Sequence, residues 1–240
     1  MDKQFQVKLI VRRVKALAPL QWLRQSWQIF TQAPLVLLLM FLTLIVNAIL
    51  GSVHEILNIA SLFISPFLTA GIYRSVVMLQ QQTAITYTDL FKPMQEVDCR
   101  MVFIRLAALN LILALPLATL FNEVHKQQQA GVVNSSLVLV LVISTLLVWM
   151  IFAYAVAIAY FLKERRLVAI MQASFIACWR NITPLVVFAV LSLLLILLTI
   201  PTMFFGLILV IPILNIAFFL SFNEFFALQV KATDDGVLEV

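Results

Sequence analysis

A series of long apolar stretches constrains this chain more than any other feature, and the first of them, residues 34–52, contains no charged residue. Five more follow, at about 56–78, 101–121, 136–162, 184–200 and 203–227. About 20 mostly apolar helical residues cross the roughly 30 Å hydrocarbon core of a bilayer. The apolar run from 184 to about 230 is too long for one span, so we place a turn at 199–202. The sequence therefore predicts an all-α integral membrane protein with six transmembrane helices.

The overall composition supports a lipid environment. Of the 240 residues, 63% are hydrophobic and 11% are charged, and the mean hydropathy is +1.07. A soluble domain has about one quarter charged residues, so this chain has too few polar side chains to cover a water-facing surface. The isoelectric point near 9.5 does not indicate nucleic acid, because the basic residues lie beside the apolar stretches. Lys and Arg in that position set topology and meet lipid head groups.

Basic residues are distributed unevenly among the segments that connect the apolar stretches. Fifteen of the 16 Lys and Arg residues lie in the N-terminal segment, in 74–105, in 163–180 or in the tail. The alternate connections at 51–55, 122–135 and 199–202 hold only Lys126. Basic residues that flank spans are retained on the cytoplasmic side. We therefore expect a multi-pass protein of the bacterial inner membrane with both termini in the cytoplasm.

Residues 20–33 separate into two faces when they are drawn as a helix. One face is polar (Gln21, Arg24, Gln25, Gln28, Thr31, Gln32), and the other is apolar apart from Ser26 (Leu20, Trp22, Leu23, Trp27, Ile29, Phe30). Trp22 and Trp27 suit a membrane interface, where an indole is half buried and its N–H stays hydrated. The sequence predicts an interfacial helix here. Residues 7–17 repeat the pattern more weakly, so we assign 1–33 to cytoplasmic amphipathic helices.

Similar short elements precede the third and fifth spans. Thr88 and Asp89 resemble capping residues before the third, and Pro93 suits the start of the next helical turn. Residues 165–181 precede the fifth. These patterns predict a transmembrane domain at 34–230 made of three hairpins, each preceded by a cytoplasmic amphipathic helix, and a cytoplasmic tail at 231–240. Amphipathic stretches are common before spans, so the pattern leaves open whether the three units are repeats.

Charged residues near the ends of the spans are the candidate site residues. Glu224 interrupts the phenylalanine-rich end of the sixth stretch, and Arg74 leaves the second at a similar depth. An unpaired carboxylate in hydrocarbon takes up a proton, so we expect Glu224 to lie at the interface or to pair with Arg74 or another basic residue. Together with Trp22 and Trp27, these residues are the predicted structural or binding positions.

The sequence shows no motif of an active site, a cofactor site or a metal site. His54, Glu55 and His125 lack the spacing of zinc ligands, and Cys99 and Cys178 are expected to be ordinary unbonded thiols on the same side of the membrane. Catalysis needs a positioned set of acid, base or nucleophile groups. We therefore expect no catalytic, cofactor-binding or metal-binding residues, no cofactor, and a protein that is not an enzyme.

Four short segments resemble an uncharacterised family of proteobacterial multi-pass inner-membrane proteins, described as a domain of unknown function. They are SWQIFTQAPL at 26–35, ISPFLTAGIYR at 64–74, TYTDLF at 86–91 and ASFIACWRNITPL at 173–185. The resemblance extends over roughly 20–227. It implies a Gram-negative inner membrane and supplies no catalytic residues.

Two function classes remain. The first is a non-enzymatic scaffold, or an envelope assembly or maintenance factor, that acts through membrane lipids, other membrane proteins or self-association. The scarcity of charge and glycine within the spans favours it. The second is a small transporter or channel for an apolar or lipid-like solute. A polar, water-reachable cavity at mid-membrane depth would indicate transport of a polar solute.

Overall fold

The structure, a computed structural model, describes residues 6–131, 134–231 and 237–238. The chain divides into two compact units. Unit 1 combines the two ends of the sequence, Met1–Gln32 and Ile176–Val240, and unit 2 is the continuous segment Ala33–Phe175. Each unit has its own core, and helix α8 (Leu167–Arg180) carries the chain from unit 2 into unit 1.

Six helices in the described part of the chain are long and apolar enough to cross a membrane, which confirms the predicted number of spans. Their bounds are Pro34–Val53, Glu55–Gln80, Val97–Gln129, Ser135–Phe161, Ile182–Thr202 and Leu207–Phe225. The third is much longer than the predicted 101–121, because the helix continues through the polar residues after Phe121. A helix needs no apolar side chains once it leaves the lipid, so hydropathy alone underestimates its length.

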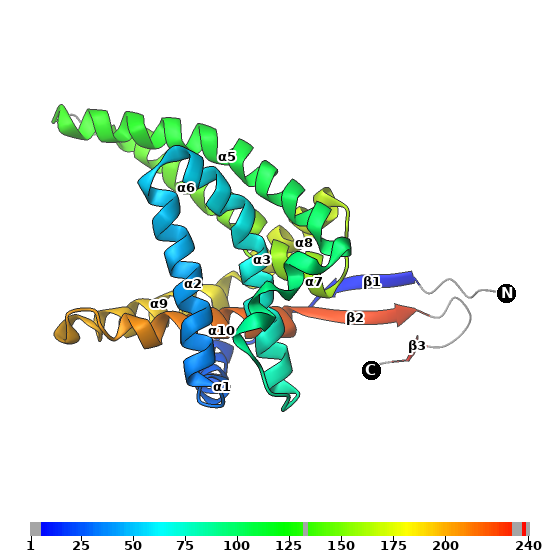
Figure 1. Ribbon diagram of the computed structural model, residues 1–240. Helices are drawn as coiled ribbons and strands as arrows, with labels where there is room; N and C mark the ends of the chain where they lie inside the picture. Colours follow the sequence, from blue (N-terminus) through cyan, green and yellow to red (C-terminus); the bar gives the residue numbers. More distant parts are fainter. Residues whose placement is uncertain (1–5, 132–133, 232–236, 239–240) are drawn as a thin grey trace. The chain divides into compact units, whose positions relative to one another are not determined.

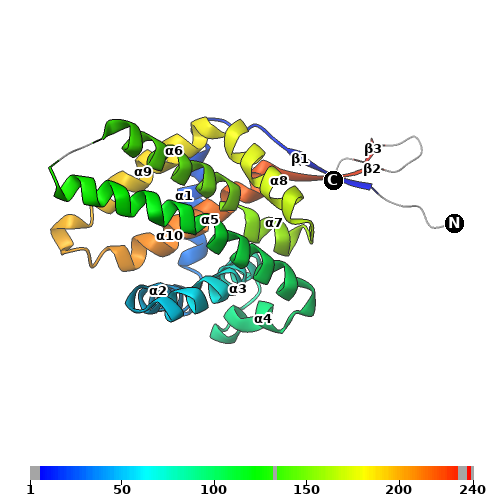
Figure 2. The ribbon, with the colours of Figure 1, turned by 90° about the horizontal axis from the view of Figure 1, so that it is seen from above.

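In unit 2 the other helices pack around α3 (Glu55–Gln80). It contacts α2 (Pro34–Val53), the short helices η1 (Tyr87–Phe91) and α4 (Lys92–Gln95), α5 (Val97–Gln129) and α7 (Ala155–Phe161). Helix α6 (Ser135–Phe152) runs beside α5 in both views (Figures 1 and 2) and has no buried residue. Its apolar surface is therefore available to lipid.

Gly71 allows η1 to approach α3 closely. A Cβ atom at Gly71 would lie 2.7 Å from the carbonyl carbon of Leu90, a distance that real side chains do not adopt. Leu90 is fully buried. The turn is closed by Asp89, whose Oδ2 accepts hydrogen bonds from the Thr86 N–H at 2.7 Å and the Thr86 hydroxyl at 2.9 Å. Thr86, rather than the predicted Thr88, is therefore the N-cap residue of this segment, while Pro93 lies in the first turn of α4 as expected.

The fourth span is interrupted between α6 and α7 by a side chain from α8. The Ser174 hydroxyl donates to the Met150 carbonyl at 2.8 Å and accepts from the Tyr154 N–H at 3.1 Å. In a regular helix Tyr154 N–H would bond directly to Met150, four residues earlier. Ser174 thus bridges the two groups and breaks the helix while satisfying both. The predicted span at 136–162 corresponds to the candidate span Ser135–Phe161, which consists of two helices.

In unit 1, α1 (Ala18–Phe30) packs against α9 (Ile182–Leu197) and α10 (Leu207–Phe225). The Trp22 ring is fully buried, with its centroid 5.7 Å from that of Phe225 and 6.1 Å from that of Phe188. Ser26, the polar exception on the predicted apolar face, is also fully buried, and its hydroxyl donates to the Leu23 carbonyl. The buried side of α1 is therefore a protein contact.

The ends of the sequence form a small antiparallel sheet instead of the helix predicted for 7–17. Strand β1 (Gln6–Val11) pairs with β2 (Phe226–Lys231), and β2 pairs with β3 (Val237–Leu238), as Figure 1 shows. Helix α10 ends at Phe225, before the predicted limit of 227, because β2 begins there. Every residue of β1 finds a backbone partner in β2, and this pairing, from the other end of the chain, overrides the weak helical spacing.

Asn181 fixes the segment that follows β1. Its side-chain oxygen accepts from the Val14 N–H at 2.8 Å, and its amide nitrogen donates to the Arg12 carbonyl at 3.0 Å and to the Ala177 carbonyl at 3.0 Å. Asn181 is fully buried. A buried amide with donors and acceptor paired stabilises a single backbone position, so the N-terminal segment of unit 1 is held at the start of α9.

Candidate functional site

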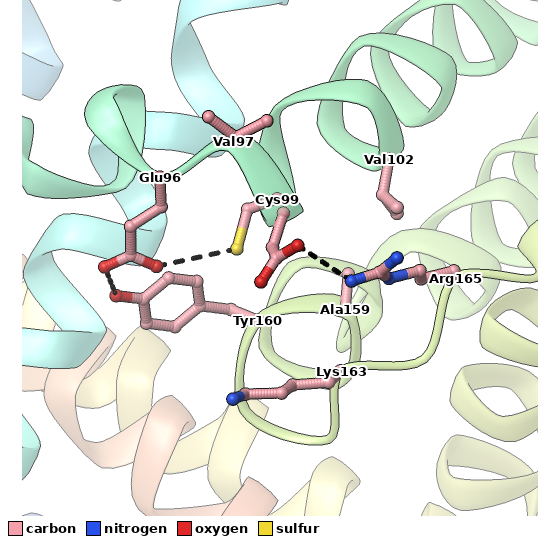
Figure 3. A pocket seen from close by; sticks show the side chains of 9 residues that line it. Glu96, Val97, Cys99, Val102, Ala159, Tyr160, Lys163 and Arg165 are labelled. Atoms are coloured by element: carbon pink, nitrogen blue, oxygen red, sulfur yellow. Dashed lines mark hydrogen bonds and ion pairs between the residues drawn. The ribbon is translucent and has the colours of Figure 1, made fainter.

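A cavity of about 380 Å³ opens in unit 2 where α5 begins and α7 ends. We call it the charged cavity. Its lining combines acidic, basic and apolar side chains from two segments (Glu96, Val97, Asp98, Cys99 and Val102; Ala159, Tyr160, Lys163 and Arg165), as Figure 3 shows. Both helices belong to candidate spans, and the cavity therefore lies at the end of the spans that carries the basic residues.

Glu96 is the centre of a hydrogen-bond network in this cavity. Its Oε1 accepts from the Tyr160 hydroxyl at 2.9 Å, as Figure 3 shows. The same oxygen accepts from the Arg74 guanidinium at 2.7 Å, and Arg74 also donates to the Tyr160 oxygen at 3.2 Å. The Cys99 thiol donates to the second oxygen, Oε2, at 3.7 Å. Hydrogen bonds between a guanidinium and a carboxylate are shorter and stronger than those between neutral groups. Glu96 thus serves as a fixed acceptor that joins α3, α5 and α7.

The other charged groups of the cavity are more exposed. Asp98 and Arg165 form an ion pair at 2.9 Å, with side chains 75% and 65% exposed. Exposed pairs of this kind contribute little to stability. Lys163 is exposed and has no ion pair with a side chain that the structure describes. The cavity therefore has one compact network, one loose ion pair and one free ammonium group.

A second, smaller cavity of about 160 Å³ lies within the span region of the same unit, and we call it the apolar cavity. It is lined by α3, α5 and the α6–α7 region (Leu62, Ser65, Pro66, Thr69, Leu106, Ala107, Asn110, Phe152, Ala155 and Val156). Pro66 has no N–H, so the Leu62 carbonyl lacks its usual helical donor. The Asn110 amide has no hydrogen bond to another described side chain or backbone group. The cavity is thus mainly apolar, with the polar side chains of Ser65, Thr69 and Asn110 in its lining.

Asp89 lies outside the spans, on η1, and is almost completely buried. It forms an ion pair with Lys92, three residues later. Burial acts to raise the pKa of the Asp89 carboxyl, but the hydrogen bonds from Lys92 and Thr86 outweigh it, so the pKa is held below its ordinary value. This group therefore stabilises the folded segment in its ionised form.

The structure separates the two predicted interfacial tryptophans. Trp22 belongs to the core of unit 1, and its indole N–H has no hydrogen-bond partner among the described residues. Trp27 is 51% exposed, as an interfacial residue would be. The helical wheel distinguishes polar from apolar faces, but it does not distinguish an apolar contact with protein from one with lipid. Of the two, only Trp27 has the exposure that the interfacial prediction requires.

The predicted partnership of Arg74 and Glu224 joins residues of different units and stays a prediction. The structure gives Arg74 a partner within unit 2, Glu96. Glu224 is half-buried near the end of α10 and has no ion pair within the described part of unit 1. The sequence analysis began from Glu224 as the group that needs a basic partner, and it did not single out Glu96.

Glu96, Tyr160 and Lys163 are the site residues that sequence reasoning missed. Each lies at the end of an apolar stretch, where isolated polar residues are common. None of them was therefore selected as a candidate site residue. A signal was present in the pattern, because Glu96 precedes the third span while Tyr160 and Lys163 end the fourth. Those two ends lie on the same side of the membrane in any alternating topology. Cys99 and Cys178 are both buried and form no disulfide in the described part of the chain, and burial raises the pKa of the Cys178 thiol to about 12.

Comparisons with family models, with curated proteins and with solved structures gave no match for this chain.

Proposed function

We propose that the chain is a non-enzymatic, multi-pass protein of the bacterial inner membrane, and that it acts as a scaffold or as an envelope assembly or maintenance factor through lipids and other membrane proteins. The observation that carries this proposal is the charged cavity at the ends of α5 and α7. Its acidic groups are already tied to arginines, and its free group is the ammonium of Lys163. This arrangement suits the binding of a lipid head group better than proton transfer.

The apolar side chains exposed on the spans support the same proposal. Leu139, Leu146 and Trp149 on α6 of unit 2 are each close to half exposed or more, and so is Val190 on α9 of unit 1. Exposed apolar side chains on a span suit acyl chains or another membrane helix. The resemblance to proteobacterial inner-membrane proteins agrees with this location. We further propose that the six spans form three hairpins, with a cytoplasmic amphipathic helix before each.

Orientation is part of the proposal and has its own test. Fifteen of the 16 basic residues lie on one predicted side, so both termini and the charged cavity are assigned to the cytoplasm. A single cysteine placed at Gln128 should be labelled in intact cells by a reagent that does not cross the membrane, while one at Gln82 should stay protected. Labelling at Gln82 from outside would overturn the orientation. The native cysteines should first be replaced by serine.

A second candidate is transport of an apolar or lipid-like solute, and the apolar cavity favours it. This cavity lies within the span region, and its polar side chains are Ser65, Thr69 and Asn110. Its volume of about 160 Å³ suits part of an acyl chain or a small apolar molecule rather than a hydrated ion. The volume of the charged cavity is more than twice that of the apolar cavity. We therefore propose lipid binding as the first candidate and transport as the second.

Purification in a mild detergent tests the two candidates. The proposed function predicts that specific lipids and membrane proteins remain bound to the wild-type chain and are identified by mass spectrometry. Transport predicts instead that purified protein in liposomes moves a labelled lipid between leaflets or between vesicles. A preparation that holds neither lipid nor protein partner, and that shows transfer in liposomes, would contradict the scaffold proposal.

A further inference from the structure

Arg74 pairs with Glu96 from outside the lining of the charged cavity, and when it is counted, one positive charge around the cavity has no counter-charge among the described side chains. Glu96 is paired with Arg74, and Asp98 is paired with Arg165. Lys163 lines the same cavity and has no ion pair among the described side chains. The cavity therefore has the charge balance of a site for one negative charge.

The backbone of α5 adds donors to the same place. Val97, Asp98 and Cys99, the first three residues of the helix, all line the cavity. The N-cap residue, Glu96, makes no side-chain capping hydrogen bond, so the first N–H groups of α5 lack an intrahelical or capping partner. Unpaired N–H groups at a helix N-terminus attract anions. These N–H groups add to the preference for anions that the Lys163 ammonium gives the cavity.

Lys163 is held in a backbone conformation that lysine seldom adopts. It follows the last turn of α7 with a φ of +50°, in the left-handed region where glycine is the usual residue. A non-glycine residue costs about 1 kcal/mol or more in this region. Strained residues tend to occur at functional sites. The position therefore supplies an ammonium group at the cavity at a cost in stability.

One wall of the charged cavity is apolar and leads deeper into the spans. Val102 on α5 and Ala159 on α7 line the charged cavity, and Leu106 and Ala155, one helical turn deeper on the same two helices, line the apolar cavity. A soluble anion gains nothing from such a wall. A molecule with an acyl chain attached to its charged group buries that chain there.

We propose that the charged cavity binds the phosphodiester group of an anionic phospholipid with one negative charge, with an acyl chain lying along Val102 and Ala159 toward the apolar cavity. The inference rests on the proposed function and names its lipid class. The Lys163 ammonium and the α5 N–H groups hold the phosphate oxygens. A zwitterionic head group fits less well, because its own ammonium group would leave the excess positive charge of the cavity unbalanced.

Thermal unfolding of the purified full-length protein in detergent tests the inference. The probes are short-chain phosphatidylglycerol, short-chain phosphatidylethanolamine, short-chain phosphatidylcholine and inorganic phosphate, each titrated separately. Phosphatidylglycerol should raise the unfolding temperature at the lowest concentration, because ligand that binds the folded state stabilises it. An equal effect of phosphatidylethanolamine or phosphatidylcholine would overturn the charge preference. An equal effect of inorganic phosphate would show a site for a soluble anion and overturn the lipid assignment.

The variant Lys163→Gly separates binding from folding. Glycine relieves the positive φ, so the variant without lipid should unfold at a temperature no lower than the wild type. Its affinity for phosphatidylglycerol should fall about tenfold, the loss expected for a charge-assisted contact. The matched control is Lys126→Gln, which removes an exposed lysine at the other end of α5 and should leave affinity unchanged. Equal losses in the two variants would show non-specific attraction and overturn the site.

The outcomes also separate this inference from the proposed function. If lipids co-purify equally with the wild type and with Lys163→Gly, the protein still acts through lipid, but this cavity is not where the lipid binds.

Discussion

The Tyr160 hydroxyl donates a 2.9 Å hydrogen bond to Oε1 of Glu96, across 64 residues of sequence. This contact joins the last turn of α7 to the start of α5, and the same carboxylate oxygen accepts from Arg74 of α3. Three helices of unit 2 thus meet at one oxygen atom beside the charged cavity.

Substitution of the network should therefore destabilise unit 2. Glu96→Gln removes the charge that Arg74 requires, and we expect the free energy of unfolding to fall by about 1–2 kcal/mol, since both side chains are about one third exposed. Tyr160→Phe should cost about 1 kcal/mol, and the double variant should cost less than the sum. Chemical unfolding in detergent, followed by circular dichroism, measures these values. Asp98→Asn is the control, and a loss as large as that for Glu96→Gln would contradict the account.

The break in the fourth span should depend on Ser174. Ser174→Ala leaves the Tyr154 N–H and the Met150 carbonyl without their bridging hydroxyl, so we expect the free energy of unfolding to fall by about 1–2 kcal/mol. Ser192→Ala is the matched control, because the Ser192 hydroxyl only donates to the carbonyl four residues earlier on its own helix. If the two variants unfold alike, the hydroxyl does not hold the break open.

Gly71 should tolerate no side chain. Gly71→Ala places a methyl group against the backbone of Leu90, and we expect a loss of about 1–3 kcal/mol as η1 moves off α3. Gly131→Asn is the comparison, since nothing lies within 4 Å of that position and asparagine accepts its φ of +72°. Thermal unfolding of the two variants checks this. Wild-type stability of Gly71→Ala would show that the close approach is not required.

Acid should weaken the η1 segment through Asp89. The folded pKa of its carboxyl lies below the ordinary value, so its stabilising effect is complete above that ordinary value, near 4, and is lost as the pH falls through the folded pKa. The unfolding temperature of the wild type should therefore fall more steeply below about pH 4 than that of Asp89→Asn. Identical acid dependence of the two proteins would rule out the role of this carboxylate.

The number of spans followed from the sequence because hydropathy is a local property. Residues 34–52 are sufficiently apolar to identify a span without knowledge of their neighbours. The contacts of individual side chains could not be predicted in the same way. Trp22 and Trp27 share an apolar face on the wheel, yet Trp22 packs against Phe225, some 200 residues away in sequence, and Trp27 stays exposed. A wheel contains no information about such distant partners.

The candidate site was predicted only in part for the same reason. Arg74 was singled out as a charge near a span end, but its partner within unit 2, Glu96, is set by the packing of α5 against α3. Pairing of β1 with β2 likewise depends on segments from opposite ends of the chain. Ser174 has no sequence signal as a helix breaker, because its effect appears only when α8 lies beside the fourth span.

Native mass spectrometry of the wild type and Lys163→Gly, released from a mild detergent, tests the central claim of lipid binding at the charged cavity most directly. The account predicts that the wild type retains one anionic phospholipid at collision energies that remove the other adducts, and that Lys163→Gly loses this lipid while it remains folded. Retention of the same lipid by both proteins, or of none by the wild type, would contradict it.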